Sequence, residues 1–410
     1  MRRVSVWEQV WLGVYWFATS FHWGALLTVV IPAEVLRFVP EAQKGSYLGL
    51  LFAGGAVMAM VISPLSGALS DRSTLRMGRR RPFVIAGVLL DCLALVGMRY
   101  APTFAWYVAT FLTIQLANNF AGGAFNGLIP DKIPPSQRGT TSGIMGFMMM
   151  MGTTAGLLLA GYFVGRGATA LVYWIVAGVM LGATALTVTN VKEAPLAAAP
   201  AISVPAFLRS FWIDPRRYPD FAWMFVTRGL VMAGFYTILS FLQFFVKDVF
   251  RLATAQAALV TSRLGAVTIA SGSIMALVAG RASDRIGRKG IVSFSGLFLA
   301  LTALGLLIQP PLSVLFGIAL IFGIGYGAFT SVDWALAVDV LPSKDSGAKD
   351  LGIWAIANTL PQVLAPTLAG PILDAFNHRA PNLGYTVIFS IAIVYVILGS
   401  IFVWKIKGAR

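Results

Sequence analysis

Five ionisable side chains lie inside long stretches of sequence that are otherwise apolar: His22, Asp91, Arg228, Arg263 and Asp333. Where such a stretch crosses a bilayer, a charged side chain at its centre costs about 2.5–3.5 kcal/mol on insertion scales. Residues of this kind therefore usually pair with one another, face a water-filled path or carry protons. Their types predict an ion pair or a proton-transfer group inside a membrane.

Arg228 and Asp333 could form an ion pair. Protonation or displacement of one partner would then release the other, which would make the pair a coupling switch. The alternatives are a permanent salt bridge that packs the protein, or snorkelling of Asp333 to nearby water. Asp91 either pairs locally, stays protonated or serves as a proton site. An unperturbed histidine titrates near neutral pH. His22 is either a hydrogen-bonded structural residue or a functional one, and Arg263 either contacts a substrate or anion or is structural.

A second chemical feature is a glycine-acid-arginine motif that occurs twice. The first copy contains Gly67, Asp71, Arg72, Gly78, Arg79 and Arg80. The second copy contains Gly280, Asp284, Arg285, Gly287 and Arg288. Asp131 and Asp339, each with a proline three residues later, repeat at nearly the same spacing. The arginines can bridge to these acids at helix ends, which predicts a clasp that biases one conformation; the alternative is that they are only topology-setting charges.

The composition indicates the elements that hold these residues. Of 410 residues, 58% are hydrophobic, the mean hydropathy is +0.79 and only 11% are charged, against about 25% in a soluble domain. A soluble fold cannot present so much apolar surface to water, whereas a membrane protein can present it to lipid. A spanning helix needs about 20 apolar residues. Such runs lie near 8–30, 46–70, 82–100, 104–128, 140–163, 169–190, 221–246, 257–280, 290–308, 313–338, 350–374 and 384–404.

The distribution of basic residues predicts the orientation. If Arg2 and Arg3 lie in the cytoplasm, most of the 31 lysines and arginines fall in loops on that side, as the positive-inside rule requires. Both termini are then cytoplasmic. The net charge of +15 is explained by topology and anionic lipid rather than by nucleic acid. No cleavable signal peptide is expected, and the short loops favour a prokaryotic cytoplasmic membrane.

The repeated motifs predict two related halves. Residues 1–190 and 220–410 would each form a six-helix bundle, and the Ala- and Pro-rich segment 191–219 would be a cytoplasmic linker with an interfacial helix near 206–212. Parallel repeats of this kind are a transporter architecture with a substrate site near mid-membrane. The fold class expected is an all-α membrane protein.

The double loop motif resembles the major facilitator superfamily over most of the chain. Within that superfamily, residues 70–83, which include Gly-Arg-Arg-Arg-Pro-Phe, resemble the sucrose/H⁺ symporter group. Phe21-x-Trp23 and Asn118-Asn119 also resemble that group. The resemblance implies a twelve-helix fold and transport of a glycoside or small polyol with protons. Two positions depart from the group: Gln115 stands where it has the proton-accepting aspartate, and Asn126 stands where it has an arginine.

The resemblance also implies which helices line the central cavity, namely the first, fourth, seventh and tenth. The polar residues on those helices are His22, Gln115, Asn118, Asn119, Asn126, Arg228 and Asp333. Trp23, Tyr236, Gln243, Tyr326 and Trp334 are on the same helices and can stack on or hydrogen-bond a sugar, or simply pack helices.

The function expected is secondary active transport of a small polar solute, a glycoside or other sugar, by alternating access. Two alternatives stay open: an exporter of drugs or metabolites, and a non-transporting assembly or sensor protein on the same scaffold. An enzyme is not expected, because no nucleophile–base pair stands out. One cysteine and two histidines predict no metal site and no cofactor. The protein is expected to be a monomer.

Overall fold

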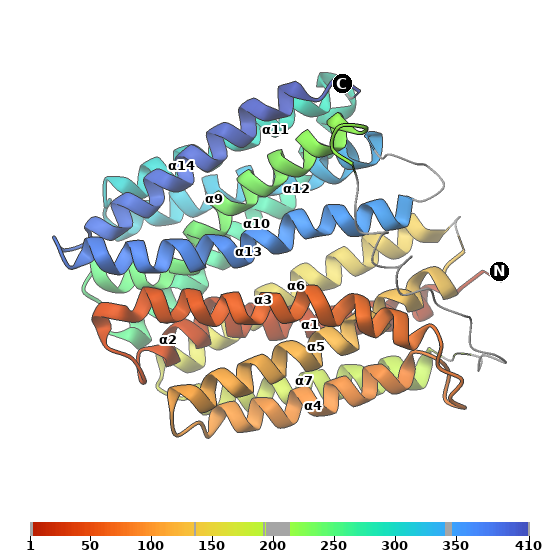
Figure 1. Ribbon diagram of the computed structural model, residues 1–410. Helices are drawn as coiled ribbons and strands as arrows, with labels where there is room; N and C mark the ends of the chain where they lie inside the picture. Colours follow the sequence, from red (N-terminus) through yellow and green to blue (C-terminus); the bar gives the residue numbers. More distant parts are fainter. Residues whose placement is uncertain (1–2, 135–136, 192, 194–213, 341–346, 409–410) are drawn as a thin grey trace. The chain divides into compact units, whose positions relative to one another are not determined.

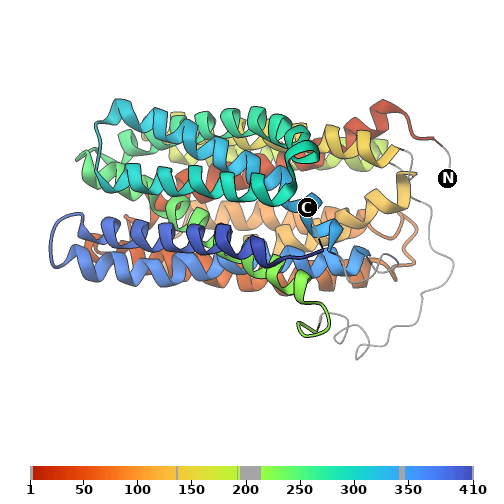
Figure 2. The same ribbon diagram turned by 90° about the horizontal axis from the view of Figure 1, so that it is seen from above.

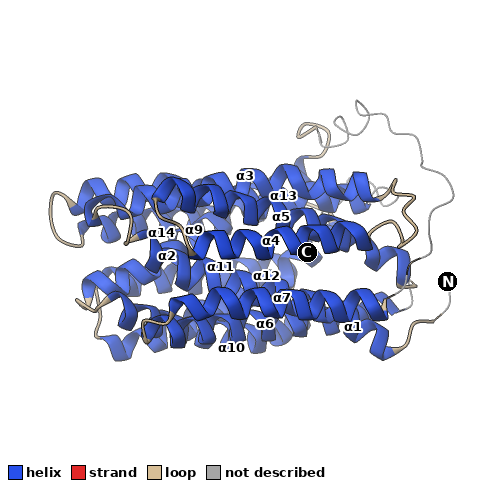
Figure 3. Cartoon of the chain, turned by 90° about the horizontal axis from the view of Figure 1, so that it is seen from below, coloured by secondary structure: helices blue, strands red, loops and turns tan. Residues whose placement is uncertain are grey.

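The computed structural model describes residues 3–134, 137–191, 193, 214–340 and 347–408. These residues form helices joined by short loops, and they include no β-strand (Figure 3). The predicted all-α class is therefore confirmed. The interfacial helix expected near 206–212, and most of the linker expected at 191–219, fall outside the described residues.

The described residues contain twelve long helical segments in the order that the apolar runs predict (Figure 1). The first half comprises α1 (Val6–Ala25) continued by the π-helical turn η1 (Leu26–Val30) and α2 (Ile31–Val35), then the 3-10 turn η2 (Glu41–Gln43), α3 (Lys44–Ser70), α4 (Arg81–Arg99), α5 (Phe104–Lys132), α6 (Arg138–Gly165) and α7 (Thr169–Asn190). The second half comprises α9 (Pro219–Val249), α10 (Thr254–Ile286), α11 (Arg288–Leu307), α12 (Leu312–Asp339), α13 (Gly347–Asn377), α14 (Leu383–Phe402) and the 3-10 turn η4 (Val403–Lys405). Most helices extend a few residues beyond the apolar runs, because their polar ends continue the backbone hydrogen bonding past the hydrocarbon.

Ten of these segments are long and apolar enough to cross a membrane when only the described residues are considered. The two that do not qualify are α5 and α13. The middle of α5 carries Gln115, Asn118, Asn119 and Asn126, whose amides lower its mean hydropathy. These are the polar groups that the sequence places on a solute-binding helix.

By contacts between residues, the chain divides into two compact units. The first consists of Met1–Val39, Gly54–Ala201 and Thr254–Ser262, and the second of Pro40–Ala53, Ile202–Ala253 and Arg263–Arg410. Helix α3 therefore contributes its first residues to the second unit and the remainder to the first. Helix α10 is divided in the same way, because its first residues belong to the first unit.

Each unit repeats the same helix pairings. In the first unit α1 packs on α6 and α7, and α4 packs on α5 and α7. In the second unit α9 packs on α13 and α14, and α11 packs on α12 and α14 (Figures 1 and 2). In each half, the first long helix packs on the fifth and sixth, and the third packs on the fourth and sixth. The internal repeat predicted from the loop motifs is thus present in the packing.

Glycines on α6 fix the rotation of α1 in the first unit. A side chain at Gly152 or Gly156 would collide with the backbone carbonyls of Phe17 and Phe21, so the two helices approach closely along this line. With this face of α1 against α6, the neighbouring positions His22 and Trp23 are directed to other helices. They reach α4 and α5, as the polar contacts below show.

Candidate functional site

The first group of polar contacts joins α1 to α5 in the first unit. The indole N–H of Trp23 donates a hydrogen bond to the Asn118 side-chain oxygen at 2.9 Å. The next residue of α5, Asn119, donates from its amide nitrogen to the side-chain oxygen of Gln115 at 3.1 Å and to the Gln115 backbone oxygen at 2.8 Å. Asn118 and Gln115 are buried, whereas Trp23 and Asn119 are partly exposed. The structure therefore forms two hydrogen-bonded pairs from four of the predicted site residues, and both pairs lie in the first unit.

Two further predicted residues, His22 and Asp91, lie against each other. The His22 Nε2 atom is 3.4 Å from Asp91 Oδ1, and both side chains are completely buried. This separation exceeds the usual range of a hydrogen bond, and among the described residues neither side chain has another hydrogen-bonding partner. The His22 ring also meets the Trp23 ring edge to face, with centroids 4.6 Å apart. The histidine thus connects Asp91 on α4 to the Trp23–Asn118 hydrogen bond.

The second unit contains the predicted ion pair. The Arg228 guanidinium on α9 is hydrogen-bonded to the Asp333 carboxylate on α12, and both residues are buried. The pairing expected from the sequence is confirmed. Tyr236 and Tyr326 lie close enough to interact electrostatically with Arg228.

Aromatic residues of α9 and α12 pack against one another near the Arg228–Asp333 pair. The Phe235 ring stacks on Tyr326 with centroids 4.1 Å apart and meets Tyr236 nearly perpendicularly at 5.3 Å. On the same helix Gln243 is 2% exposed, and its amide atoms have no hydrogen-bonding partner among the described residues. A buried amide without a partner costs about 1–3 kcal/mol.

Three predicted site residues take no part in these clusters. Asn126 and Arg263 are exposed, and neither forms a hydrogen bond or ion pair with the described residues. The side chain of Trp334 lies outside the described residues.

The first copy of the loop motif forms a network of charges. Arg80 is 5% exposed. Its guanidinium donates to Asp71 at 2.6 Å and to Asp131 at 2.7 Å, and Arg79 also pairs with Asp131. Burial lowers the pKa of Arg79, but the hydrogen bond and charge of Asp131 outweigh burial and raise it. The predicted bridge from the arginines to Asp131 is present, and it lies within the first unit.

The glycines of both motif copies share one backbone conformation. Gly78 has φ 101° and Gly287 has φ 96°, in a region that side chains disfavour and glycine adopts freely. Gly78 also faces Glu193, whose carboxylate accepts hydrogen bonds from the backbone N–H groups of Arg80 and Arg81 at 2.9 and 3.0 Å. The turns themselves therefore favour glycine at positions 78 and 287.

The other motif residues are less constrained. In the first copy Arg72 is partly buried, and its Nε and Nη2 atoms have no hydrogen-bonding partner among the described residues. In the second copy Arg285 is exposed, whereas Gly280 and Arg288 are partly buried. The side chains of Asp284 and Asp339 lie outside the described residues, so the predicted second bridge stays a prediction.

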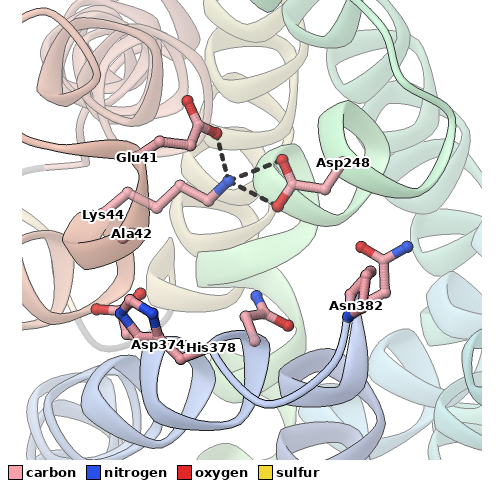
Figure 4. A pocket seen from close by; sticks show the side chains of 9 residues that line it. Glu41, Ala42, Lys44, Asp248, Asp374, His378 and Asn382 are labelled. Atoms are coloured by element: carbon pink, nitrogen blue, oxygen red, sulfur yellow. Dashed lines mark hydrogen bonds and ion pairs between the residues drawn. The ribbon is translucent and has the colours of Figure 1, made fainter.

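A further cluster of charges was not anticipated by the sequence analysis. This Lys44 cluster consists of Glu41, Lys44, Lys247, Asp248, Asp374 and Tyr385. The Lys44 ammonium points between the carboxylates of Glu41 and Asp248, beside a pocket of about 340 Å³ (Figure 4). All of these residues belong to the second unit.

Asp374 ties the start of α3 to the end of α13. Its carboxylate accepts hydrogen bonds from the backbone N–H groups of Gly45 and Ser46 at 3.0 and 2.7 Å, and from the Ser46 hydroxyl at 2.6 Å. It therefore caps the first turn of α3. Asp248 and Asp374 both lie near helix C-termini, where the helix dipole disfavours an acid. That unfavourable placement is the one sequence signal that could have identified the cluster.

Comparison with known proteins agrees with this architecture. The family model for the Major Facilitator Superfamily matches residues 10–349 and 273–408. Sucrose transport protein SUC4 of Arabidopsis thaliana is 23% identical, covering 86% of this chain and 81% of that protein. The multi-drug resistance efflux pump PmrA of Streptococcus pneumoniae is 25% identical, covering 68% of this chain and 69% of the pump.

Two solved structures share the fold. A point mutant of the nucleoside transporter NupG superimposes with a TM-score of 0.77 at 14% identity and covers 97% of this chain and 99% of its own. A bacterial homolog of the human lysosomal transporter Spinster gives a TM-score of 0.72 at 17% identity, with 98% and 99% coverage. Since the family model spans most of the residues that form the twelve helices, the chain belongs to the Major Facilitator Superfamily.

Proposed function

We propose that this membrane protein is a proton-coupled importer of a neutral polyhydroxy solute, most simply a glycoside. The observation that carries the proposal is the hydrogen bond between Trp23 and Asn118 beside the Gln115–Asn119 amide pair. Amide groups both donate and accept hydrogen bonds, as sugar hydroxyls do. An indole adds a flat apolar face for the C–H surface of a sugar ring.

The charges of the second unit favour a neutral solute. Arg228 is already neutralised by Asp333, and both are buried. An anionic solute would have to displace the Asp333 carboxylate, and breaking a buried ion pair is costly. The unpartnered Gln243 amide offers a neutral contact instead. The similarity to SUC4, described as a sucrose transport protein, supports the same solute class.

The same proposal includes topology and assembly. Both termini and both motif loops would lie in the cytoplasm of a prokaryotic cell, and the protein would work as a monomer by alternating access, without catalysing covalent chemistry. The basic motif loops support this orientation through the positive-inside rule.

Uptake into liposomes tests the proposal. Purified protein would be reconstituted and given radiolabelled sucrose, maltose or other glycosides, with and without an inward proton gradient. Accumulation that requires the gradient and disappears with an uncoupler is the expected result, and protein-free liposomes are the control. Uptake without gradient dependence would remove proton coupling. Absence of uptake for every glycoside, together with extrusion of cationic dyes, would replace the proposal with drug export.

A further inference from the structure

We propose that His22 and Asp91 together form the proton-binding site of this transporter, in place of an acid at Gln115. The inference rests on the proposed proton-coupled transport and names the group that carries the proton. It starts from the pairing of two titratable side chains, from α1 and α4, at a position where each is completely buried.

Among the described residues, the charged side chains on the helices around this dyad lie near helix ends, including Glu8 on α1 and Arg81 and Arg99 on α4. Helix α7 packs on both α1 and α4 and contains no acidic or basic residue. The charged residues of α5 and α6 lie near the helix ends, at Asp131, Lys132 and Arg138. Tyr15 and Cys92 are the other titratable groups that interact with Asp91, and both are ordinarily neutral at physiological pH.

The net charge of the dyad then depends on one proton. With neutral imidazole and ionised carboxylate it carries one negative charge. A single proton, bound from the side of higher proton concentration, makes it neutral overall, either as imidazolium with carboxylate or as imidazole with carboxylic acid. The same proton is released to the other side. Because an uncompensated buried charge is costly, the protonated dyad is the form that tolerates exclusion from water.

The contacts of His22 connect this proton to the solute-binding groups. The His22 ring lies against the Trp23 ring, and Trp23 donates to Asn118. Protonation that draws His22 toward Asp91 would reposition the indole and hence the Asn118 amide. The dyad would in this way link proton binding to solute affinity. It also explains how Gln115, which cannot titrate, can stand on α5 of a proton-coupled carrier.

The test separates coupling from transport. Wild type, Asp91→Asn, His22→Gln and the control Cys92→Ser, which removes the neighbouring thiol, would be reconstituted and compared in two assays. One is proton-gradient-driven accumulation of a glycoside, and the other is solute counterflow without a gradient. We expect both dyad variants to lose accumulation by about tenfold or more, since acids and histidines relay protons in carriers, and to retain counterflow. Cys92→Ser should behave as wild type in both.

A second measurement does not depend on the solute. Infrared difference spectra between acidic and neutral pH should contain a component from the dyad in the wild type, either a protonated-carboxyl band that Asp91→Asn removes or an imidazolium band that His22→Gln removes. Wild-type accumulation that survives unchanged in both variants would overturn the dyad and leave the proposed function intact. The dyad would be purely structural if both folded dyad variants lost accumulation and counterflow together and their infrared difference spectra matched that of the wild type. Wild-type transport without any proton dependence would overturn both.

Discussion

The ammonium nitrogen of Lys44 lies 2.6 and 2.7 Å from the two carboxylate oxygens of Asp248, although the two residues are 204 positions apart in the chain. Lys44 is only 3% exposed, and Glu41 provides a second carboxylate at 2.7 Å. The Tyr385 hydroxyl donates to Asp248 at 2.5 Å. The Lys44–Asp248 pair is therefore the centre of the Lys44 cluster. Its disruption should weaken the contacts among α3, α9 and α14.

Asp248→Asn should destabilise the protein by about 3 kcal/mol, because it leaves the buried Lys44 without its main counter-charge. The thermal midpoint of the detergent-solubilised protein, followed by intrinsic fluorescence, would measure the loss. Lys44→Met combined with Asp248→Leu should recover much of it, since neither charge then remains buried. If the Asp248→Asn variant is as stable as the wild type, water solvates Lys44 at this position.

The Arg228–Asp333 pair allows a permanent salt bridge to be distinguished from a coupling switch. Arg228→Gln and Asp333→Asn should each lower stability by about 3 kcal/mol, and the double variant should lose less than either, because it leaves no buried unpaired charge. If the pair is a switch, the double variant will recover stability but not gradient-driven uptake. Recovery of both properties would assign the pair to packing alone.

Trp23→Phe should weaken solute binding while preserving the fold. Phenylalanine keeps an aromatic face next to His22 but cannot donate to Asn118. The apparent KM for the transported glycoside should rise by about fivefold to tenfold, corresponding to about 1–1.4 kcal/mol for one hydrogen bond. Trp106→Phe is the matched control, because among the described residues its indole donates to the backbone of Gly97, near the end of α4. Equal effects of the two substitutions would contradict the assignment of Trp23.

Arg80→Gln should slow transport and lower stability more than Arg285→Gln, a substitution of an exposed arginine in the second motif copy. Arg80 is buried and bridges two aspartates, whereas Arg285 is exposed. Exposed ion pairs contribute at most about 1 kcal/mol, so the Arg285 variant should stay near wild type. The uptake rate and the thermal midpoint would be measured for both variants. Indistinguishable values would show that the bridge from Arg80 to Asp131 contributes neither to transport nor to stability.

The proposed orientation can be checked with single cysteines in a Cys92→Ser background. Thr74→Cys lies in the first motif loop, and Pro102→Cys lies between α4 and α5; both positions are exposed. A membrane-impermeant thiol reagent should label Pro102→Cys in intact cells and label Thr74→Cys only after the cells are opened. The reverse pattern would invert the proposed topology.

The sequence predicted some contacts and not others for physical reasons. Helix positions follow from apolar length, which the hydrocarbon thickness fixes. The Arg228–Asp333 pair was predictable, because each is the charge that the other needs within an otherwise apolar interior. By contrast, His22 and Asp91 were foreseen only as separate candidates, since their meeting depends on the rotation of α1, which the glycines of α6 determine.

The Lys44 cluster was not predicted for a different reason. Lys44 and Lys247 read as ordinary loop cations, and nothing in the local pattern connects them with Asp374. Their association arises because the start of α3 packs with α9 and α13 in the second unit, and that packing is a property of the tertiary structure.

The hydrogen bonds from Gly45 to Asp374 also have a consequence for biosynthesis. The two residues are 329 positions apart, so a ribosome finishes α3 long before it makes the carboxylate that caps it. During most of translation, the first N–H groups of α3 must be satisfied by water or lipid headgroups. Chains truncated before α13 would keep this end of α3 unfinished, and quality-control proteases would meet in them a helix terminus that the complete protein never exposes.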